Sequence, residues 1–365
     1  MTFLNVLAVL VTISIYGLLS YYVGYTGWNW LKSSKLPQHK KGYVTVMVLL
    51  STAYFLGSLL SFLPLEIIGA YWFVVIGYSL ILFPAANIVV YILKKKNIKN
   101  GTFWTGIGVI GFFFFILVYG SINAWNPIVR TYDITVEKSA EVKELQILMV
   151  SDLHLGPIVG EKHIQRMVEI ADDVKPDIIL IAGDIIDDNV DPFIEKEMGK
   201  HLEKMNAPLG VYAIPGNHDY YGDDLLEIES EMEQTGLTFL LDETESINND
   251  FYIVGRKDLT DTNRETAEEL VEELDKTKPI IMLDHQPVEL DEASASGVDV
   301  ILSGHTHRGQ LAPANIITSM IYENDWGYLK KENLHSFVSS GFGTWGPPLR
   351  IGSRSEVMVI NVTFK

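Results

Sequence analysis

Aspartate, asparagine and histidine side chains follow five apolar runs in the second half of the chain, at the point where each run ends. One run, Ile178–Ala182, leads into Gly183-Asp184. A short apolar run indicates a buried strand, and in open α/β sheets ligands bind at the carboxyl ends of strands. Taken alone, an aspartate after a strand is more often a turn or a helix cap. The other four ends carry Asp152-Leu153-His154, Asn217-His218-Asp219, Asp284-His285 and His305-Thr306-His307.

These residue types are typical of a site for divalent metal ions. Imidazoles with oxygen ligands suit Mn, Fe or Zn, and the chain has no cysteine for a zinc–thiolate site. With Asp219 and Asp284 left aside, two Asp, one Asn and five His make eight candidate ligands, which are too many for one ion and about right for two. In Asp-x-His and His-x-His, alternate residues face one site if the backbone stays extended. We expect the histidines elsewhere to be surface or capping residues: His39, His163, His201 and His335.

The segments that must position these side chains alternate between strand-like and helix-like patterns from Tyr132 onward. Such alternation favours a layered α/β sandwich with helices outside. The strand-like runs are Leu145–Val150, Ile178–Ala182, Val211–Ile214, Phe251–Val254, Ile280–Leu283, Val298–Leu302, Ser336–Ser339 and Val357–Val362. The helical patterns are Glu161–Val174, Pro192–Met205, Asp224–Gln234 and Arg264–Leu274.

Four apolar segments precede this part, and each is long enough to cross a bilayer without a charged residue. We therefore predict a four-helix transmembrane region in residues 1–122, a linker and first strand in 123–144, and a catalytic domain in 145–365. The linker itself is expected at Asn123–Arg130. An anchor is the favoured role of the spans, with sensing or partner binding as the alternative. The spans are roughly Phe3–Val23, Tyr43–Leu63, Ile67–Leu93 and Thr102–Ile122.

Charge predicts which side of the membrane each part faces. Lysines occupy the loops after the first and third spans, while the start of the chain and the expected Pro64–Glu66 turn carry no Lys or Arg. The positive-inside rule then places the N-terminus and the catalytic half outside the cytoplasm. Residues up to Arg130 carry nine basic residues and one acid, and the remainder 19 basic and 45 acidic residues. A half with a net charge of −26 makes nucleic acid an unsuitable partner.

The strand-end residues form a recognisable set of motifs. Asp152-x-His154, Gly183-Asp184-x-x-Asp187, Gly216-Asn217-His218-Asp219, His285 and Gly304-His305-x-His307 resemble, in order and in full, those of the calcineurin-like metallophosphoesterases. The match covers roughly 220 of 365 residues. The tail, with Ser340–Thr344 and Pro348-Leu349-Arg350, is similar to a bacterial branch of membrane-attached phosphodiesterases and lipid-sugar pyrophosphatases. That branch usually has a glycine where this chain has Arg308.

The apolar segments and the resemblance together predict an α-helical four-span membrane region followed by an α/β (α+β) metallophosphoesterase β-sandwich flanked by helices. The resemblance also implies two divalent ions, with manganese favoured, that polarise a phosphoryl oxygen and share a hydroxide for in-line attack. His218 would protonate the leaving oxygen or stabilise charge on the phosphoryl group. Asp219 would either orient His218 or be an exposed residue after a turn. The implied ligands are Asp152, His154, Asp184 and His307 for one ion, and Asp184 again, Asn217, His285 and His305 for the other.

Substrate contacts are less specific. Arg308 and Arg350 are candidate phosphate clamps because guanidinium groups match phosphate oxygens, although a surface salt bridge explains Arg350 equally well. Phe342, Trp345 and Trp326 line an apolar mouth or belong to the core.

Three functions remain open at this stage. The leading hypothesis is a membrane-anchored phosphoesterase that cleaves a phosphodiester or pyrophosphate bond of an amphipathic or cell-envelope substrate. Its partners would be a phosphorylated small molecule or lipid-linked substrate and membrane lipid. The alternatives are a phosphomonoesterase or nucleotidase acting on a soluble substrate, and a catalytically silent receptor or scaffold. The oligomeric state stays open.

Overall fold

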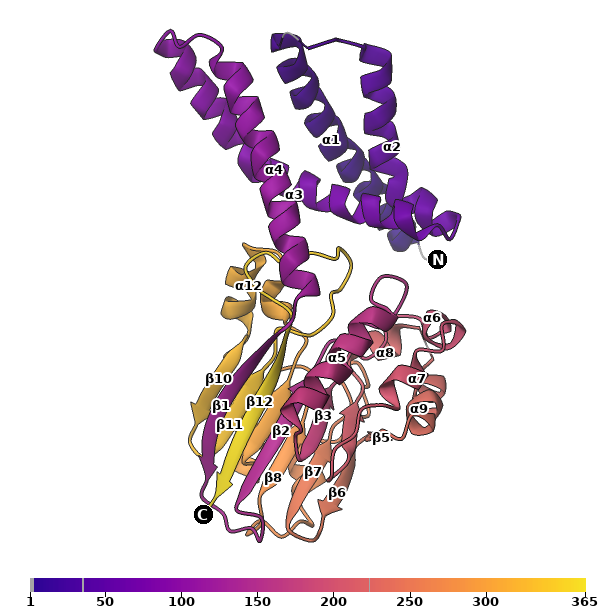
Figure 1. Cartoon of the computed structure of the whole chain (residues 1–365), viewed down its shortest axis with the longest axis vertical. Coiled ribbons are helices and arrows are strands. Elements are labelled where there is room, and N and C mark those ends of the chain that lie inside the picture. Colours follow the sequence, from indigo (N-terminus) through magenta and orange to yellow (C-terminus); the bar gives the residue numbers. More distant parts are fainter. Residues whose placement is uncertain (1–2, 35, 223) are drawn as a thin grey trace. The chain divides into compact units, whose positions relative to one another are not determined.

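The computed structural model describes residues 3–34, 36–222 and 224–365, and the chain divides into two compact units (Figure 1). One unit comprises Met1–Tyr119 with Gly346–Pro348, and the other comprises Gly120–Trp345 with Leu349–Lys365. We call them the helical unit and the α/β unit.

The predicted spans are confirmed as helices: in the described residues, four helices are long and apolar enough to cross a membrane. Pro64 and Glu66, expected in a turn, instead lie in the first turn of the third helix, where proline is well tolerated. The helices are α1 (Phe3–Ser33), α2 (Lys40–Leu59), α3 (Leu63–Lys95) and α4 (Gly101–Trp125).

The connection between helix and sheet is shorter than the predicted Asn123–Arg130. Helix α4 continues to Trp125, and strand β1 (Ile128–Val136) begins three residues later. The last turns of α4 belong to the α/β unit, because Gly120 O accepts a hydrogen bond from Arg350 N at 3.0 Å. Asn123 Nδ2 also donates to Arg350 O at 3.2 Å. The end of α4 is thus hydrogen-bonded to a later segment of the α/β unit.

Two six-stranded sheets face each other in the described part of the α/β unit (Figure 1). Apolar side chains such as Ile147, Leu180 and Leu302 fill the space between them. The helices α5 (Glu161–Val174), α6 (Asp191–Glu195), α7 (Gly199–Leu202) and α9 (Leu225–Gln234) add apolar residues to the outer face of the first sheet. Helices α10 (Ala267–Val271) and α11 (Leu290–Ser296) do so on the second. The predicted sandwich with outer helices is confirmed.

The order of strands in the first sheet is β1-β12-β2-β3-β4-β5, and in the second β10-β11-β9-β8-β7-β6. The first contains, besides β1, β12 (Glu356–Phe364), β2 (Glu144–Val150), β3 (Ile178–Ala182), β4 (Val211–Ile214) and β5 (Thr238–Phe239). The second contains β10 (Gly327–Lys331), β11 (Leu334–Val338), β9 (Val300–Ser303), β8 (Ile280–Leu283), β7 (Phe251–Gly255) and β6 (Glu243–Ile247).

Sequence patterns located the buried strands well and the polar elements poorly. The bounds predicted for β3, β4, β8 and α5 are those observed. Strands β5, β6 and β10 were not predicted, since they are short or, like Glu243–Ile247, mostly polar. The helix predicted at Pro192–Met205 is wrong as a single element, because Glu197 adopts a left-handed conformation (φ 51°) between α6 and α7. The helix predicted at Arg264–Leu274 is shorter in the structure, where it corresponds to the five residues of α10.

The topology places the five motif-bearing strand ends together. Strands β2, β3 and β4 are mutually parallel, as are β8 and β9. Their carboxyl ends therefore open at one edge of each sheet, and β3 and β8 face each other across the core.

Candidate metal centre

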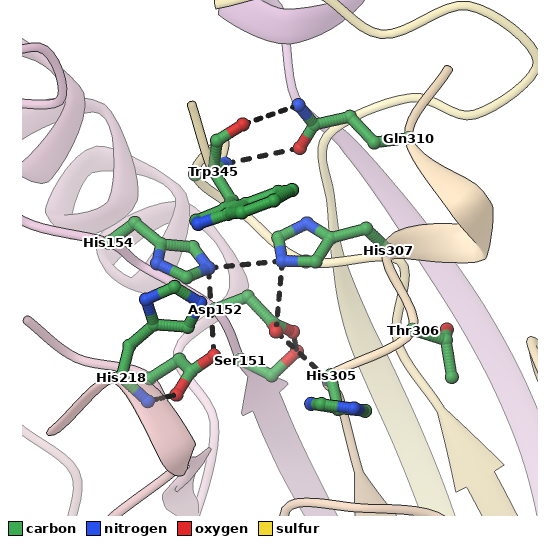
Figure 2. A network of polar contacts seen from close by, with 12 residues as sticks. Ser151, Asp152, His154, His218, His305, Thr306, His307, Gln310 and Trp345 are labelled. Atoms are coloured by element: carbon green, nitrogen blue, oxygen red, sulfur yellow. Dashed lines mark hydrogen bonds and ion pairs between the residues drawn. The ribbon is translucent and has the colours of Figure 1, made fainter. Parts of the chain in front are cut away.

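Side chains that follow β2, β3 and β9 form the first half of the site (Figure 2). His307 Nε2 lies 3.3 Å from Asp152 Oδ1 and 3.0 Å from His154 Nε2. His154 Nε2 in turn lies 3.7 Å from Asp184 Oδ2. Ligand atoms of Asp152, His154 and His307 all fall within 4.8 Å of one another. The structure thus brings together the four side chains expected for one ion.

The second half of the site lies on the other side of Asp184. Its Oδ2 is 3.1 Å from His285 Nε2, and His305 Nδ1 is 2.8 Å from Asn217 Oδ1. Ligand atoms of Asp184, His285 and His305 also fall within 4.8 Å of one another. One carboxylate therefore faces both donor sets, as a bridging ligand would.

His285 and His307 differ in protonation. His285 Nδ1 lies 2.8 Å from Ala182 O, and since a carbonyl can only accept, Nδ1 carries a proton. Burial opposes a charged His285 ring, but the carboxylate of Asp184, 3.1 Å from Nε2, outweighs it and raises the pKa of His285 well above its usual value. A cation bound at Nε2 would take the place of the second proton. Burial lowers the pKa of His307 well below its usual value and keeps that ring neutral, as a ligand must be.

The backbone at the ligands is left-handed rather than extended. The prediction that alternate residues converge along an extended chain is therefore wrong for both Asp-x-His and His-x-His. Such φ values are uncommon for residues other than glycine and cost about 1–3 kcal/mol each, so the surrounding structure must impose them. The φ angles are 52° at Asp152, 47° at His154, 52° at Asp184, 66° at His305 and 47° at His307.

Three motif glycines leave space for the ligands. A Cβ on Gly183, where φ is +85°, would lie 2.5 Å from His285 Nδ1. A Cβ on Gly216 would lie 2.2 Å from Asp184 Oδ1, and one on Gly304 would lie 2.4 Å from Asp152 Oδ2. At Gly183 the group that comes close to the backbone is the imidazole of His285.

His218 stands beside the ligands without joining either predicted set. Its ring centroid is 4.7 Å from that of His154, and its backbone N donates to Asp184 Oδ1 at 2.9 Å. The side-chain Nδ1 lies 2.5 Å from Asp188 Oδ1. Asp188, which the sequence analysis missed, is thus the carboxylate that orients His218. Only its place in the Asp187-Asp188 pair after the Gly-Asp motif could have drawn attention to it.

Neither expectation for Asp219 is correct. Its side chain is fully buried, so it is not an exposed turn residue, and its carboxylate accepts backbone hydrogen bonds instead of contacting His218. The donors are Gly216 N and Ile186 N, both at 2.8 Å, and Ile185 N at 3.2 Å. Burial and the charge of Asp184 raise the pKa of Asp219 to about 7. Asp219 therefore ties the loop after β4 to the loop after β3.

The two candidate arginines have different surroundings. Arg308 has φ 48°, which explains why a glycine suits this position, and its Cζ lies 3.8 Å from the centroid of the Trp326 ring. Arg130 stacks on the same ring, with its Cζ 4.9 Å from the centroid. Trp326 Nε1 donates to Glu356 Oε1 at 2.9 Å. Arg308 is partly exposed next to the candidate ligand His307, and its role as a phosphate clamp stays a prediction.

Arg350 is neither a surface salt bridge nor an exposed clamp. It is fully buried, and burial lowers its pKa to about 10. Its guanidinium donates to Ser340 O at 2.5 Å and to Gly343 O at 2.6 Å, and Nη2 lies 3.1 Å from His307 Nδ1. Because a guanidinium only donates, His307 accepts at Nδ1 here. An ion on Nε2 would need this last contact to open, since the neutral ring would then carry its proton on Nδ1.

The three candidate aromatic residues differ in exposure. Phe342 is buried, whereas the side chain of Trp345 is 54% exposed and Trp326 is partly buried. Figure 2 shows the Trp345 indole beside the His154 and His307 rings, and its centroid is 6.0 Å from that of His218. Gln310 holds the Trp345 backbone with two hydrogen bonds of 2.7 and 3.1 Å.

The prediction of surface or capping positions is wrong for two histidines outside the motifs. His163 is buried, and its Nε2 lies 2.8 Å from Phe342 O. His335 is also buried and lies 2.9 Å from the hydroxyl of Tyr328.

Sequence comparison with known proteins shows the family to which the chain is related. The profile of the calcineurin-like phosphoesterase family matches residues 145–309. A transmembrane protein with metallophosphoesterase domain from Danio rerio is 30% identical over 340 residues, which cover 86% of this chain and 76% of the relative. An uncharacterized metallophosphoesterase from Aquifex aeolicus is 32% identical over 255 residues, which cover 68% of this chain and 96% of the relative.

The chain therefore belongs to the calcineurin-like metallophosphoesterase family, and the resemblance seen in its motifs is confirmed. The family implies divalent metal ions, for which the site has the ligand groups. The four apolar helices and the transmembrane relatives from Danio rerio and Bos taurus make it a membrane protein. The bacterial branch stays a prediction.

Proposed function

We propose that the protein is a membrane-anchored phosphoesterase that uses two divalent ions, with manganese favoured, to hydrolyse a phosphodiester or pyrophosphate bond. The position of Asp184 carries the proposal. Its Oδ2 lies 3.1 Å from His285 Nε2 and 3.7 Å from His154 Nε2, so one carboxylate can serve both ions. When bound, such ions polarise a phosphoryl oxygen and activate a water for in-line attack.

His218 would handle the proton of the leaving group. Asp188 lies 2.5 Å from its Nδ1, and a carboxylate there accepts the hydrogen bond of the Nδ1 proton. That arrangement leaves Nε2 as the atom that delivers a proton to the leaving oxygen. The same pairing holds the ring in a fixed orientation beside His154.

The expected substrate is an amphipathic, phosphorylated molecule of the cell envelope. Arg308, stacked on Trp326, offers a guanidinium for a phosphate oxygen, and the exposed indole of Trp345 offers an apolar contact at the mouth. The net charge of −26 on the residues after Arg130 opposes binding of nucleic acid. Lysines near the ends of α1 and α3 support a catalytic unit outside the cytoplasm.

Hydrolysis of two aryl esters by the full-length protein in detergent tests the proposal. We expect manganese-dependent hydrolysis of bis-(p-nitrophenyl) phosphate, faster than hydrolysis of the monoester, with loss on chelation and recovery on manganese addition. Asp184→Asn should abolish both activities, while Asp173→Asn on the exposed face of α5 should leave them unchanged. A preference for the monoester would favour the soluble-substrate alternative, and metal-independent turnover would refute the proposed mechanism.

A further inference from the structure

Helix α12 (Ala314–Ile321) exposes an apolar face that nothing in the α/β unit covers among the described residues. None of its residues is buried. Ile316, Ile317, Met320 and Ile321 lie on one side of the helix. The smaller polar residues Asn315, Thr318 and Ser319 lie on the other side. Clustered apolar exposure of this kind marks an interaction surface, unlike single exposed residues. The exposed fractions are 57% for Ile316, 59% for Ile317, 82% for Met320 and 67% for Ile321.

Hydrogen bonds place the start of α12 close to the end of the fourth membrane helix. Arg350 N donates to Gly120 O in α4 at 3.0 Å, and Ala312 N donates to Ile351 O at 2.6 Å. Arg350 and Ile351 are consecutive residues, so these two bonds link Ala312, two residues before α12, to the last turns of α4. Figure 1 shows α12 at the same end of the α/β unit as these last turns.

We propose that α12 lies in the interface of the lipid bilayer on the side where α4 leaves the membrane. The apolar faces of interfacial helices reach about 5–10 Å into the boundary between headgroups and acyl chains. Because α12 follows a segment that is linked to the end of α4, its apolar face starts close to the membrane that α4 crosses. Continuity with the membrane that α4 already crosses favours lipid over a second protein chain as the occupant. The face of Ile316, Ile317, Met320 and Ile321 would contact acyl chains.

The same helix is bonded to the candidate metal centre. Thr318 Oγ1 in α12 donates to Asp325 Oδ2 at 2.8 Å, and Thr306 Oγ1 donates to Asp325 O at 2.7 Å. Thr306 lies between His305 and His307 in the sequence. Docking of α12 would therefore hold the metal-binding loop at the depth of the lipid headgroups. The inference concerns lipid contact and does not depend on hydrolysis.

The absence of cysteine from the chain allows a direct test. Full-length Met320→Cys would be labelled with an NBD fluorophore and reconstituted in phosphatidylcholine–phosphatidylglycerol vesicles. Leu226→Cys in α9 is the matched control, because that side chain is 80% exposed in the same unit. We expect blue-shifted emission at position 320, quenched at least twofold by lipids brominated in their acyl chains, and solvent-like, unquenched emission at position 226.

Two results would overturn the proposal. Solvent-like emission without quenching at both positions would show that α12 does not enter the lipid. Pyrene at position 320 provides the second measurement: excimer emission that grows with the protein-to-lipid ratio would show that another copy of the chain covers α12. Both readouts come from protein that need not turn over any substrate, so they are independent of the proposed activity.

Discussion

Replacing Arg350 by methionine should strongly destabilise the α/β unit. The methionine fills much of the same volume but removes the guanidinium donors that Ser340 O and Gly343 O accept at 2.5 and 2.6 Å. Hydrogen bonds to charged groups contribute about 1.5–3 kcal/mol each, and both carbonyls would stay buried without a partner. We therefore expect a loss of about 3–6 kcal/mol in the free energy of unfolding.

Thermal unfolding of the full-length protein in detergent measures this effect. For a domain of about 150–250 residues, each kcal/mol lowers Tm by about 2–4 °C, so Arg350→Met should lower Tm by about 6–24 °C. The Tm of Arg350→Lys should lie between those of the wild type and Arg350→Met, since an ammonium keeps the charge but not the planar arrangement of guanidinium donors. Arg166→Met is the matched control, because that side chain is 51% exposed and should shift Tm only slightly.

A Tm of Arg350→Met within about 2 °C of the wild type would contradict a structural role for this residue. If the same variant then showed a raised KM for a phosphodiester, the phosphate-clamp interpretation of Arg350 would be restored. A lower Tm together with unchanged kinetics at low temperature would support the buried geometry seen here.

Three further outcomes are expected. Asp184→Asn should lower the metal content of the manganese-loaded protein at both positions, because one carboxylate faces both donor sets; two retained equivalents by elemental analysis would contradict the bridging role. His218→Asn should reduce kcat by roughly 10²–10⁴-fold with metal content nearly unchanged, and Asp188→Asn should reduce it less; loss of an ion from His218→Asn would make that residue a ligand. Protease added to spheroplasts should degrade the region after Asn123 and spare a tag inserted at Gln38, whereas the reverse pattern would invert the proposed topology.

Much of the scaffold could be predicted from local patterns. Both ends of β3 were predicted correctly because its five consecutive apolar side chains end at a glycine. In the fold, that glycine leaves room for the His285 ring. The four membrane helices were recognisable because bilayer thickness demands long apolar runs. The candidate metal ligands stood out because Asp, Asn and His recur where strands end. These features depend on composition and on short periodicities, which can be read from the sequence without knowledge of the fold.

The arrangement of the site depended on residues that meet only in the folded chain. Asp188, rather than the neighbouring Asp219, faces His218, although Asp188 is 30 residues away in sequence. Arg350 is buried against His307, 43 residues distant, rather than exposed to a substrate. Left-handed turns at Asp152 and His305, rather than an extended chain, aim the ligands inward. Local sequence determined which groups are available at the strand ends. The pairing of β2, β3 and β4 in one sheet and β8 and β9 in the other decided which groups meet, because long-range packing sets the direction of each side chain.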